Sequence, residues 1–171
     1  IILSVMSRII IYPNNNIIDM NRNLNTVFLD LLDRDIEKIK TEIEAFTDGE
    51  KIWISTGTVR NSVGNLCLHL TGALNHFIGA VLGNTGYVRN YEEEFTKKDI
   101  PREQLLKDLE AAKIVVRNTL LDLSENDLNK MYPKRVHEKE VPVYWFLSHL
   151  LTHVNYHLGQ MNYLRRVINP L

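Results

Sequence analysis

Histidine is the residue type whose spacing in this sequence points most clearly to chemistry. The chain of 171 residues contains six histidines, and His149, His153 and His157 follow one another at intervals of four within VYWFLSHLLTHVNYHLGQ. Residues four apart share one face of a helix, so two such imidazoles can bind one metal ion. Neutral imidazole is the commonest metal ligand in proteins. The spacing therefore predicts a metal site on a helix.

The helical wheel indicates which two of these histidines face inward. At about 100° per residue, His157 lies about 40° from the centre of the apolar face, His153 about 80° and His149 about 120°. The residues that define this face are Val143, Leu147, Leu150, Val154, Leu158, Met161 and Ile168. We therefore predict His153 and His157 as the ligand pair and expect His149 to face outward or toward a neighbouring helix.

A third ligand is expected from the segment 61–82, which contains His69 and His76. These two are separated by about 10 Å along a helix axis, so they are not expected to bind the same ion. His69 lies about 100° from the apolar stripe of its helix, on the side of the small residues Gly72 and Ala73. We predict His69 as the third ligand. The residues predicted to line or orient the pocket are Asn65, His76, His149 and Gln160.

Other interpretations of these residues remain open from the pattern alone. Histidines four apart on a bundle helix are also compatible with two hydrogen-bonded structural side chains. The run Glu92–Glu94 is interpreted as a solvated loop, and Cys67 as a small buried hydrophobe. The absence of a Glu-x-x-His motif argues against a di-iron carboxylate bundle. The two histidine-bearing segments place no Asp or Glu near the three histidines, which disfavours hydrolysis more than thiol transfer.

Four amphipathic segments must position the histidines, and their apolar residues recur at helical spacing. They cover residues 24–46, 61–82, 101–121 and 142–168. Between them we expect an extended connection at 51–60, a loop at 86–99, a short capped turn after Ser124 and an extended excursion at 131–141. These elements predict an all-α four-helix bundle with long connections.

The composition limits which binding partners and which cell compartment we expect. With a net charge of -1 and 24% charged residues, scattered Lys and Arg give no basic face for nucleic acid. No segment is long and apolar enough to predict a membrane span. The single cysteine excludes an intrachain disulfide and favours the reducing cytoplasm. Residues 1–19 differ in character from the rest of the chain, so we expect an upstream addition there and the bundle domain at 20–171.

Two segments resemble the DinB-like (DinB/YfiT) superfamily of metalloenzymes, and within it a subgroup without an assigned activity. They are NLCLHLTGALNHFIGAVLG at 65–83 and THVNYHLGQMNYLRR at 152–166, and the resemblance covers about residues 20–171. It implies an up-down-down-up bundle, a homodimer and a divalent metal ion held by His69, His153 and His157. Many relatives have His-Arg-Gly-Gln where this chain has Leu158 after His157, so a substrate contact by that arginine is not carried over.

The expected function depends on the expected ligand set. Three neutral histidines leave a coordination position open, as in catalytic rather than structural zinc sites. All-nitrogen ligands suit zinc or nickel, with iron also compatible. Some DinB-like relatives use low-molecular-weight thiols, so we expect a metal-dependent thiol S-transferase or hydrolase that acts on a small molecule. The alternative is a non-catalytic protein that binds metal and dimerises.

Overall fold

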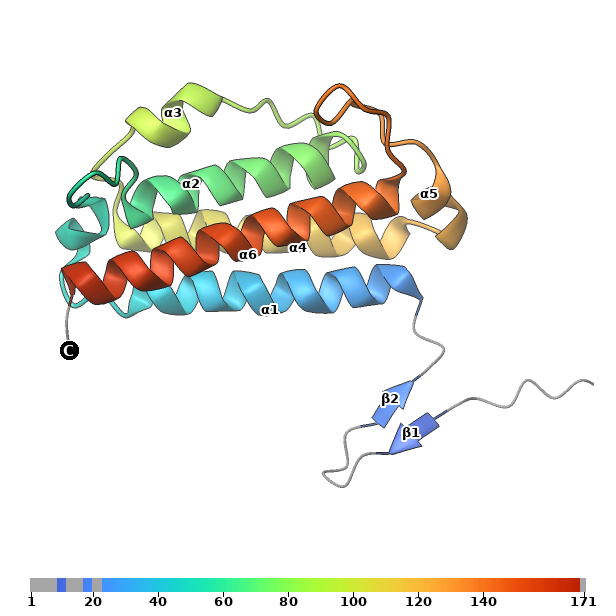
Figure 1. Ribbon diagram of the computed structural model, residues 1–171, viewed down its shortest axis with the longest axis horizontal. Helices are drawn as coiled ribbons and strands as arrows, with labels where there is room; N and C mark the ends of the chain where they lie inside the picture. Colours follow the sequence, from blue (N-terminus) through green and yellow to red (C-terminus); the bar gives the residue numbers. More distant parts are fainter. Residues whose placement is uncertain (1–8, 12–16, 20–22, 170–171) are drawn as a thin grey trace, which may run out of the picture.

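The computed structural model describes residues 9–11, 17–19 and 23–169, and four long helices dominate it. Figure 1 shows these helices side by side as a bundle. Their bounds are α1 Leu24–Glu44, α2 Val63–Leu74, α4 Arg102–Asp122 and α6 Val143–Ile168. All four predicted helices are therefore confirmed, and the fold is all-α as expected.

The order of the helices is up-down-down-up. In Figure 1, α1 and α6 run in one direction, whereas α2 and α4 run in the other. Helix α1 packs against α4 and α6, and α2 packs against the same two helices. The histidine-bearing helices α2 and α6 are thus antiparallel neighbours, which lets the middle of one face the middle of the other.

Polar caps fix where α1 and α2 begin. Asn23 accepts a hydrogen bond from the backbone N–H of Thr26 at the start of α1. Ser62 and Asn65 form a reciprocal capping box at the start of α2, which satisfies backbone N–H groups that have no partner within the helix. Helix α2 continues directly into a π-helix, η2, over Asn75–Ala80. The second predicted helix is therefore continuous to residue 80 but changes its hydrogen-bonding pattern after Leu74.

The connections contain more helix than the sequence pattern predicts. The interval 86–99 was expected to be a loop, but it contains α3, Tyr91–Thr96. The interval 51–60 was expected to be extended, but a 3-10 helix, η1, covers Gly49–Trp53. The short turn after Ser124 is confirmed as α5, Glu125–Asn129. The 131–141 excursion is also confirmed, with an isolated bridge between Val136 and Lys139.

A small antiparallel hairpin precedes the helices. Strand β1, Ile9–Ile11, pairs with strand β2, Ile17–Asp19, and Ile10 lies opposite Ile18. The other residues of the segment 1–19 lie outside the described residues, so its expected origin as an upstream addition stays a prediction. None of the described helices is long and apolar enough to cross a membrane.

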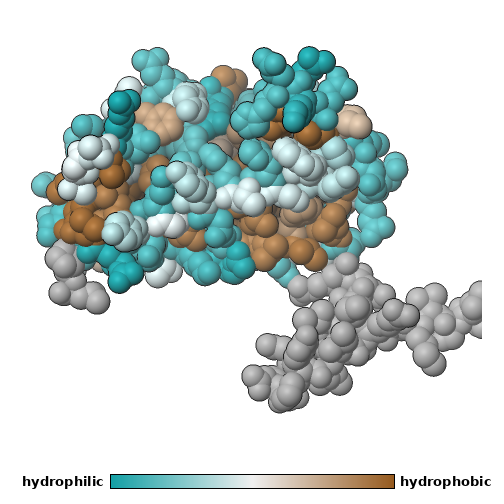
Figure 2. Space-filling view, viewed as in Figure 1, coloured by the Kyte–Doolittle hydropathy of each residue, from teal (hydrophilic) through white to brown (hydrophobic). Residues whose placement is uncertain are grey.

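One apolar core joins the four long helices. Leu32, Ile39 and Ile43 of α1, Leu70 of α2 and Leu147 of α6 are completely buried. Cys67 is also fully buried, and burial raises the pKa of its thiol to about 12. The interpretation of Cys67 as a small buried hydrophobe is confirmed. The outward faces are mostly hydrophilic in the view of Figure 2.

Two helical glycines give opposite predictions for stability. A Cβ on Gly64 would lie 2.7 Å from ring carbons of Trp53, whereas a Cβ on Gly159 would have nothing within 4 Å. We expect Gly64→Ala to lower the free energy of unfolding by about 1–3 kcal/mol through overpacking. Gly159→Ala should raise it by roughly 0.5–1 kcal/mol because alanine is the better helix former. Urea denaturation of both variants checks this pair, and equal changes would contradict the described packing.

Candidate metal centre

Three histidines from two helices meet on one side of the bundle. His69 comes from α2, and His153 and His157 come from α6. One ligand nitrogen from each of the three lies within 4.8 Å of the other two. The Nε2 atoms of His69 and His153 are 3.0 Å apart. The structure therefore brings together the same three residues that the helical wheel and the family resemblance select.

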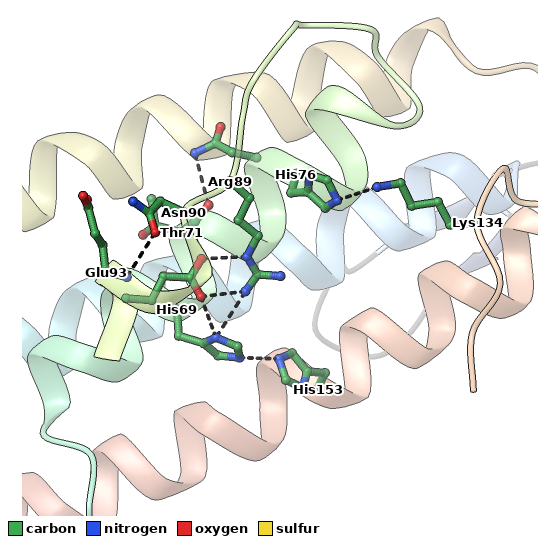
Figure 3. Close-up of polar contacts among 10 residues, drawn as sticks. His69, Thr71, His76, Arg89, Asn90, Glu93, Lys134 and His153 are labelled. Carbon is green, nitrogen blue, oxygen red and sulfur yellow. Dashed lines mark hydrogen bonds and ion pairs between the residues drawn. The ribbon is translucent and has the colours of Figure 1, made fainter. Parts of the chain in front are cut away.

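The His69 imidazole is held from behind by an ion pair. Its Nδ1 lies 3.0 Å from Oε2 of Glu94. Arg89 donates to the same carboxylate twice, from Nε at 2.6 Å and from Nη2 at 2.7 Å. Nη2 of Arg89 also lies 3.2 Å from Nδ1. In the tautomer with the proton on Nδ1, His69 donates to the carboxylate and Nε2 has a lone pair for a metal ion. Figure 3 shows the arrangement of these side chains, with Arg89 on one side of the His69 ring and His153 on the other.

The His157 imidazole is oriented in a similar way from its own helix. Its Nδ1 lies 2.7 Å from Oε1 of Gln160, an atom that can only accept a hydrogen bond. The amide nitrogen of Gln160 donates to the hydroxyl of Tyr156 at 3.1 Å. In the tautomer with the proton on Nδ1, His157 donates to Gln160 and Nε2 is left as its ligand atom.

Burial keeps two of the three imidazoles neutral. Burial lowers the pKa of His153 to about 4, and the neighbouring His157 and His69 add to this effect. Burial also lowers the pKa of His157, although the hydrogen bond to Gln160 opposes it. A metal ion binds only neutral imidazole. His153 and His157 are thus already in the protonation state that ligation requires at neutral pH.

The buried negative charge of Glu94 is balanced by the side chains that contact it. Its residue is only 5% exposed, and burial alone would raise its pKa. The hydrogen bonds from His69 and Arg89 outweigh burial, so the pKa of Glu94 is lowered overall. Glu94 is therefore a carboxylate at neutral pH, paired with Arg89 and His69. A histidine ligand whose second nitrogen donates to a carboxylate is the usual arrangement around protein-bound zinc.

The donor set fits a divalent metal ion. Two nitrogens that are each 2.0–2.1 Å from a tetrahedral ion lie about 3.3 Å apart, close to the 3.0 Å between His69 and His153. Two of the three rings have Nδ1 at hydrogen-bond distance from a side-chain oxygen, which leaves Nε2 as the nitrogen that could bind an ion. The aromatic rings of Tyr91 and Phe95 pack against His69 at 6.0 and 5.0 Å between centroids. These rings line the α3 side of the His69 imidazole.

The predicted pocket residues lie in three different environments. Asn65 is buried and donates to the backbone oxygens of Glu94 and Lys97, so it attaches α3 to α2. His76 lies on η2 and pairs with Lys134 at 2.9 Å (Figure 3). His149 is half-buried, stacks on Trp145 and contacts the ring of His137. Among the described residues, neither His76 nor His149 belongs to the cluster of potential ligands.

The interpretation of Glu92–Glu94 as a solvated loop was wrong for Glu94. Helix α3 directs Glu94 inward, whereas Glu92 is exposed. Gly72 makes this possible, because a Cβ there would overlap Oε1 of Glu94. The small residues beside His69 thus admit α3, and the expectation that no carboxylate lies near the histidines holds for α2 and α6 alone. The sequence offered one signal of a helix here, because Asn90 is a good N-cap residue and the acidic residues that follow it suit a first helical turn.

A family profile matches almost the whole helical region. It covers residues 22–170 and is described as Protein of unknown function (DUF1572). The chain belongs to this family. The DinB-like fold that the resemblance implies is confirmed by a solved DinB-like structure. A search of curated proteins gave no match.

Two solved structures share the fold of this chain. A conserved protein from Enterococcus faecalis superposes with a TM-score of 0.70 at 18% identity, covering 86% of this chain and 98% of that one. A DinB-like protein from Bacillus cereus superposes with a TM-score of 0.65 at 16% identity, covering 82% and 89% respectively. At these identities the likeness shows that this chain shares the DinB-like fold.

Removing the charge behind His69 should weaken metal binding without removing a ligand. We expect Glu94→Gln to lower zinc affinity about 10–100-fold, because the carboxylate fixes the proton on Nδ1 of His69. Isothermal titration with zinc at neutral pH measures the effect. The matched control is Glu93→Gln, which removes a carboxylate that pairs with exposed Lys97 instead. Equal affinities of the two variants would contradict the role of Glu94.

The pKa shifts of the site predict how the metal-free protein responds to acid. His153 has a pKa of about 4 in the fold, whereas an unfolded histidine has about 6.5. Between these values the unfolded chain binds more protons, so the free energy of unfolding falls as the pH drops from 6.5 toward 4. Urea denaturation after chelation, compared between wild type and His153→Gln, should show a shallower pH dependence in the variant. Identical slopes would show that His153 is not held neutral.

Proposed function

We propose that the chain binds one divalent metal ion, zinc or nickel, through His69, His153 and His157 and uses it to act on a small molecule. The observation that supports this proposal most is that two imidazoles from different helices are oriented in the same way, each by a side-chain oxygen at Nδ1. Glu94 holds His69 and Gln160 holds His157, each by Nδ1. Structural histidines need no such common direction, whereas ligands of one ion do.

A bound divalent ion would supply Lewis acidity and lower the pKa of a coordinated water or thiol. The chain itself supplies three ligands and so leaves room for at least one further group, as in catalytic zinc sites. Tyr91 and Phe95 line the α3 side of the His69 imidazole, and Arg89 keeps Glu94 ionised. These residues position the site.

Thiol transfer is the reaction class that we favour over hydrolysis. Glu94 is the carboxylate adjacent to the cluster, but it is bound to Arg89 and to the far nitrogen of His69. It is therefore not free to accept a proton from a substrate or water. A low-molecular-weight thiol needs no separate base, because metal coordination deprotonates it. We propose such a thiol as one substrate and an electrophilic small molecule as the other.

Metal content of purified protein tests the ligand set. We expect wild type to retain about one equivalent of zinc or nickel and His153→Ala to lose at least about 100-fold in affinity, since one of three protein ligands is removed. His149→Ala is the matched control, because it removes a histidine of α6 that stacks on Trp145 instead. Equal metal content in wild type and His153→Ala would overturn the site.

Conjugation assays separate the enzyme from a non-catalytic metal-binding protein. Glutathione or bacillithiol would be mixed with 1-chloro-2,4-dinitrobenzene and protein loaded with zinc or nickel. We expect turnover with at least one thiol and its loss after chelation. Turnover that persists after chelation would contradict the proposal. A metal-loaded protein that is inactive with every thiol would favour the non-catalytic alternative, for which the proposed homodimer would be measured by sedimentation.

A further inference from the structure

An apolar groove of about 610 Å³ lies beside the three-histidine cluster. It is formed by the segment 56–61, the start of α2 and the last third of α6. Val59, Leu66, Tyr163, Leu164 and Val167 supply most of its walls. In Figure 2, hydrophobic side chains gather at the end of the molecule where α6 ends. The volume is within the range of roughly 300–1,000 Å³ that is typical of small-molecule sites.

The groove adjoins the candidate metal centre at Gln160, on the Nδ1 side of His157. Gln160 lines the groove, and the same side chain accepts the Nδ1 proton of His157 at 2.7 Å. Leu66 lies three residues before His69, on the same side of α2. The larger groove near η1 is lined by residues 47–51, 53–54 and 98–103, which do not contact the cluster. A smaller pocket is lined by Glu94, which contacts His69. The apolar groove in turn shares Gln160 with the surroundings of His157.

Gly159 keeps part of this groove open. It lies within α6 and lines the groove, yet a Cβ at this position would meet nothing within 4 Å. Neither packing nor backbone conformation requires glycine there, and glycine inside a helix costs about 1 kcal/mol relative to alanine. The space in front of Gly159 is thus available to an occupant that is not part of the fold.

Arg60 gives the groove a charge. Of the described residues that line the groove, it alone is charged. Arg165, near the end of α6, is already paired with Glu42 at 2.5 Å. Arg60 is exposed, and within the described part of the chain its guanidinium has no ion pair. An apolar groove with one cationic side chain at its rim is complementary to an apolar molecule with one negative charge.

We infer that this groove binds the apolar body of an amphiphilic monoanion, with its carboxylate or sulfonate near Arg60, and that such molecules are the electrophilic substrate class of the histidine site. This inference rests on the proposed function for its second half. The claim that the groove binds such a molecule depends only on the groove, so it can be tested separately from the claim that the molecule is a substrate.

Fluorescence titration with 1-anilinonaphthalene-8-sulfonate tests the binding half. We expect saturable binding of one probe molecule to wild type. Gly159→Phe should weaken it by at least about tenfold, because the added ring fills volume worth roughly 1.5 kcal/mol of apolar burial. Gly49→Phe is the matched control: a Cβ there also meets nothing within 4 Å, and Gly49 lies outside the groove. Equal binding by both variants would overturn the groove as the site.

Competition with matched amphiphiles tests the charge. Decanoate should displace the probe from wild type more strongly than 1-decanol does. Arg60→Gln should weaken decanoate about twofold to fivefold, as expected for an exposed ion pair, and leave 1-decanol unchanged. Equal competition by the two compounds would overturn the anionic part of the inference. A change in sedimentation of Gly159→Phe, with unchanged probe binding, would assign the groove to a second copy of the chain instead.

Cobalt loading links the groove to the histidines. Saturating decanoate should shift the visible absorption of the cobalt-loaded wild type, and should shift it less in Gly159→Phe. An unchanged spectrum in a protein that binds both cobalt and decanoate would overturn the substrate assignment while leaving the proposed function intact. Failure to bind cobalt, zinc or nickel at all would overturn the proposed function, and the probe titration would still decide the groove.

Discussion

The hydrogen-bonded ion pair of Glu94 with Arg89 and His69 is the interaction on which the candidate site depends. A carboxylate this deeply buried is strongly unfavourable unless charged and hydrogen-bonding partners compensate it. Arg89 supplies two hydrogen bonds and His69 a third. In the tautomer with the proton on Nδ1, the same contacts leave Nε2 of His69 as the nitrogen that faces the other two histidines.

The surrounding fold is arranged to bring Glu94 to this position. Gly72 leaves space for its carboxylate on α2. Asn65 caps α2 and also holds the backbone of α3 through the carbonyls of Glu94 and Lys97. The antiparallel pairing of α2 with α6 then sets His153 and His157 opposite His69. The three histidines therefore stand on two long helices, and a short helix from the connection after η2 supplies the carboxylate that contacts one of them.

The sequence predicts the clustering of the three histidines but misses the residues that support them, for physical reasons. His153 and His157 lie in a helix of 26 residues, where periodicity measures the inward direction reliably, and His69 lies in a similarly regular segment. Glu94 belongs to a helix of six residues, which is too short for a periodic pattern. Its burial depends on a connection that folds back over α2, and its contact with His69 spans 25 positions in the chain. The neighbouring Glu92 and Glu93 made the whole run resemble a solvated surface.

X-ray absorption spectroscopy of the protein loaded with one equivalent of zinc tests the central claim most directly. We predict three imidazole nitrogens at about 2.0–2.1 Å, with the remaining ligand a light atom and no sulfur contribution at about 2.3 Å. Cys67 is buried within the core and does not take part in the cluster. A spectrum with fewer than three imidazoles, or with a sulfur ligand from the protein, would contradict a site built from His69, His153 and His157.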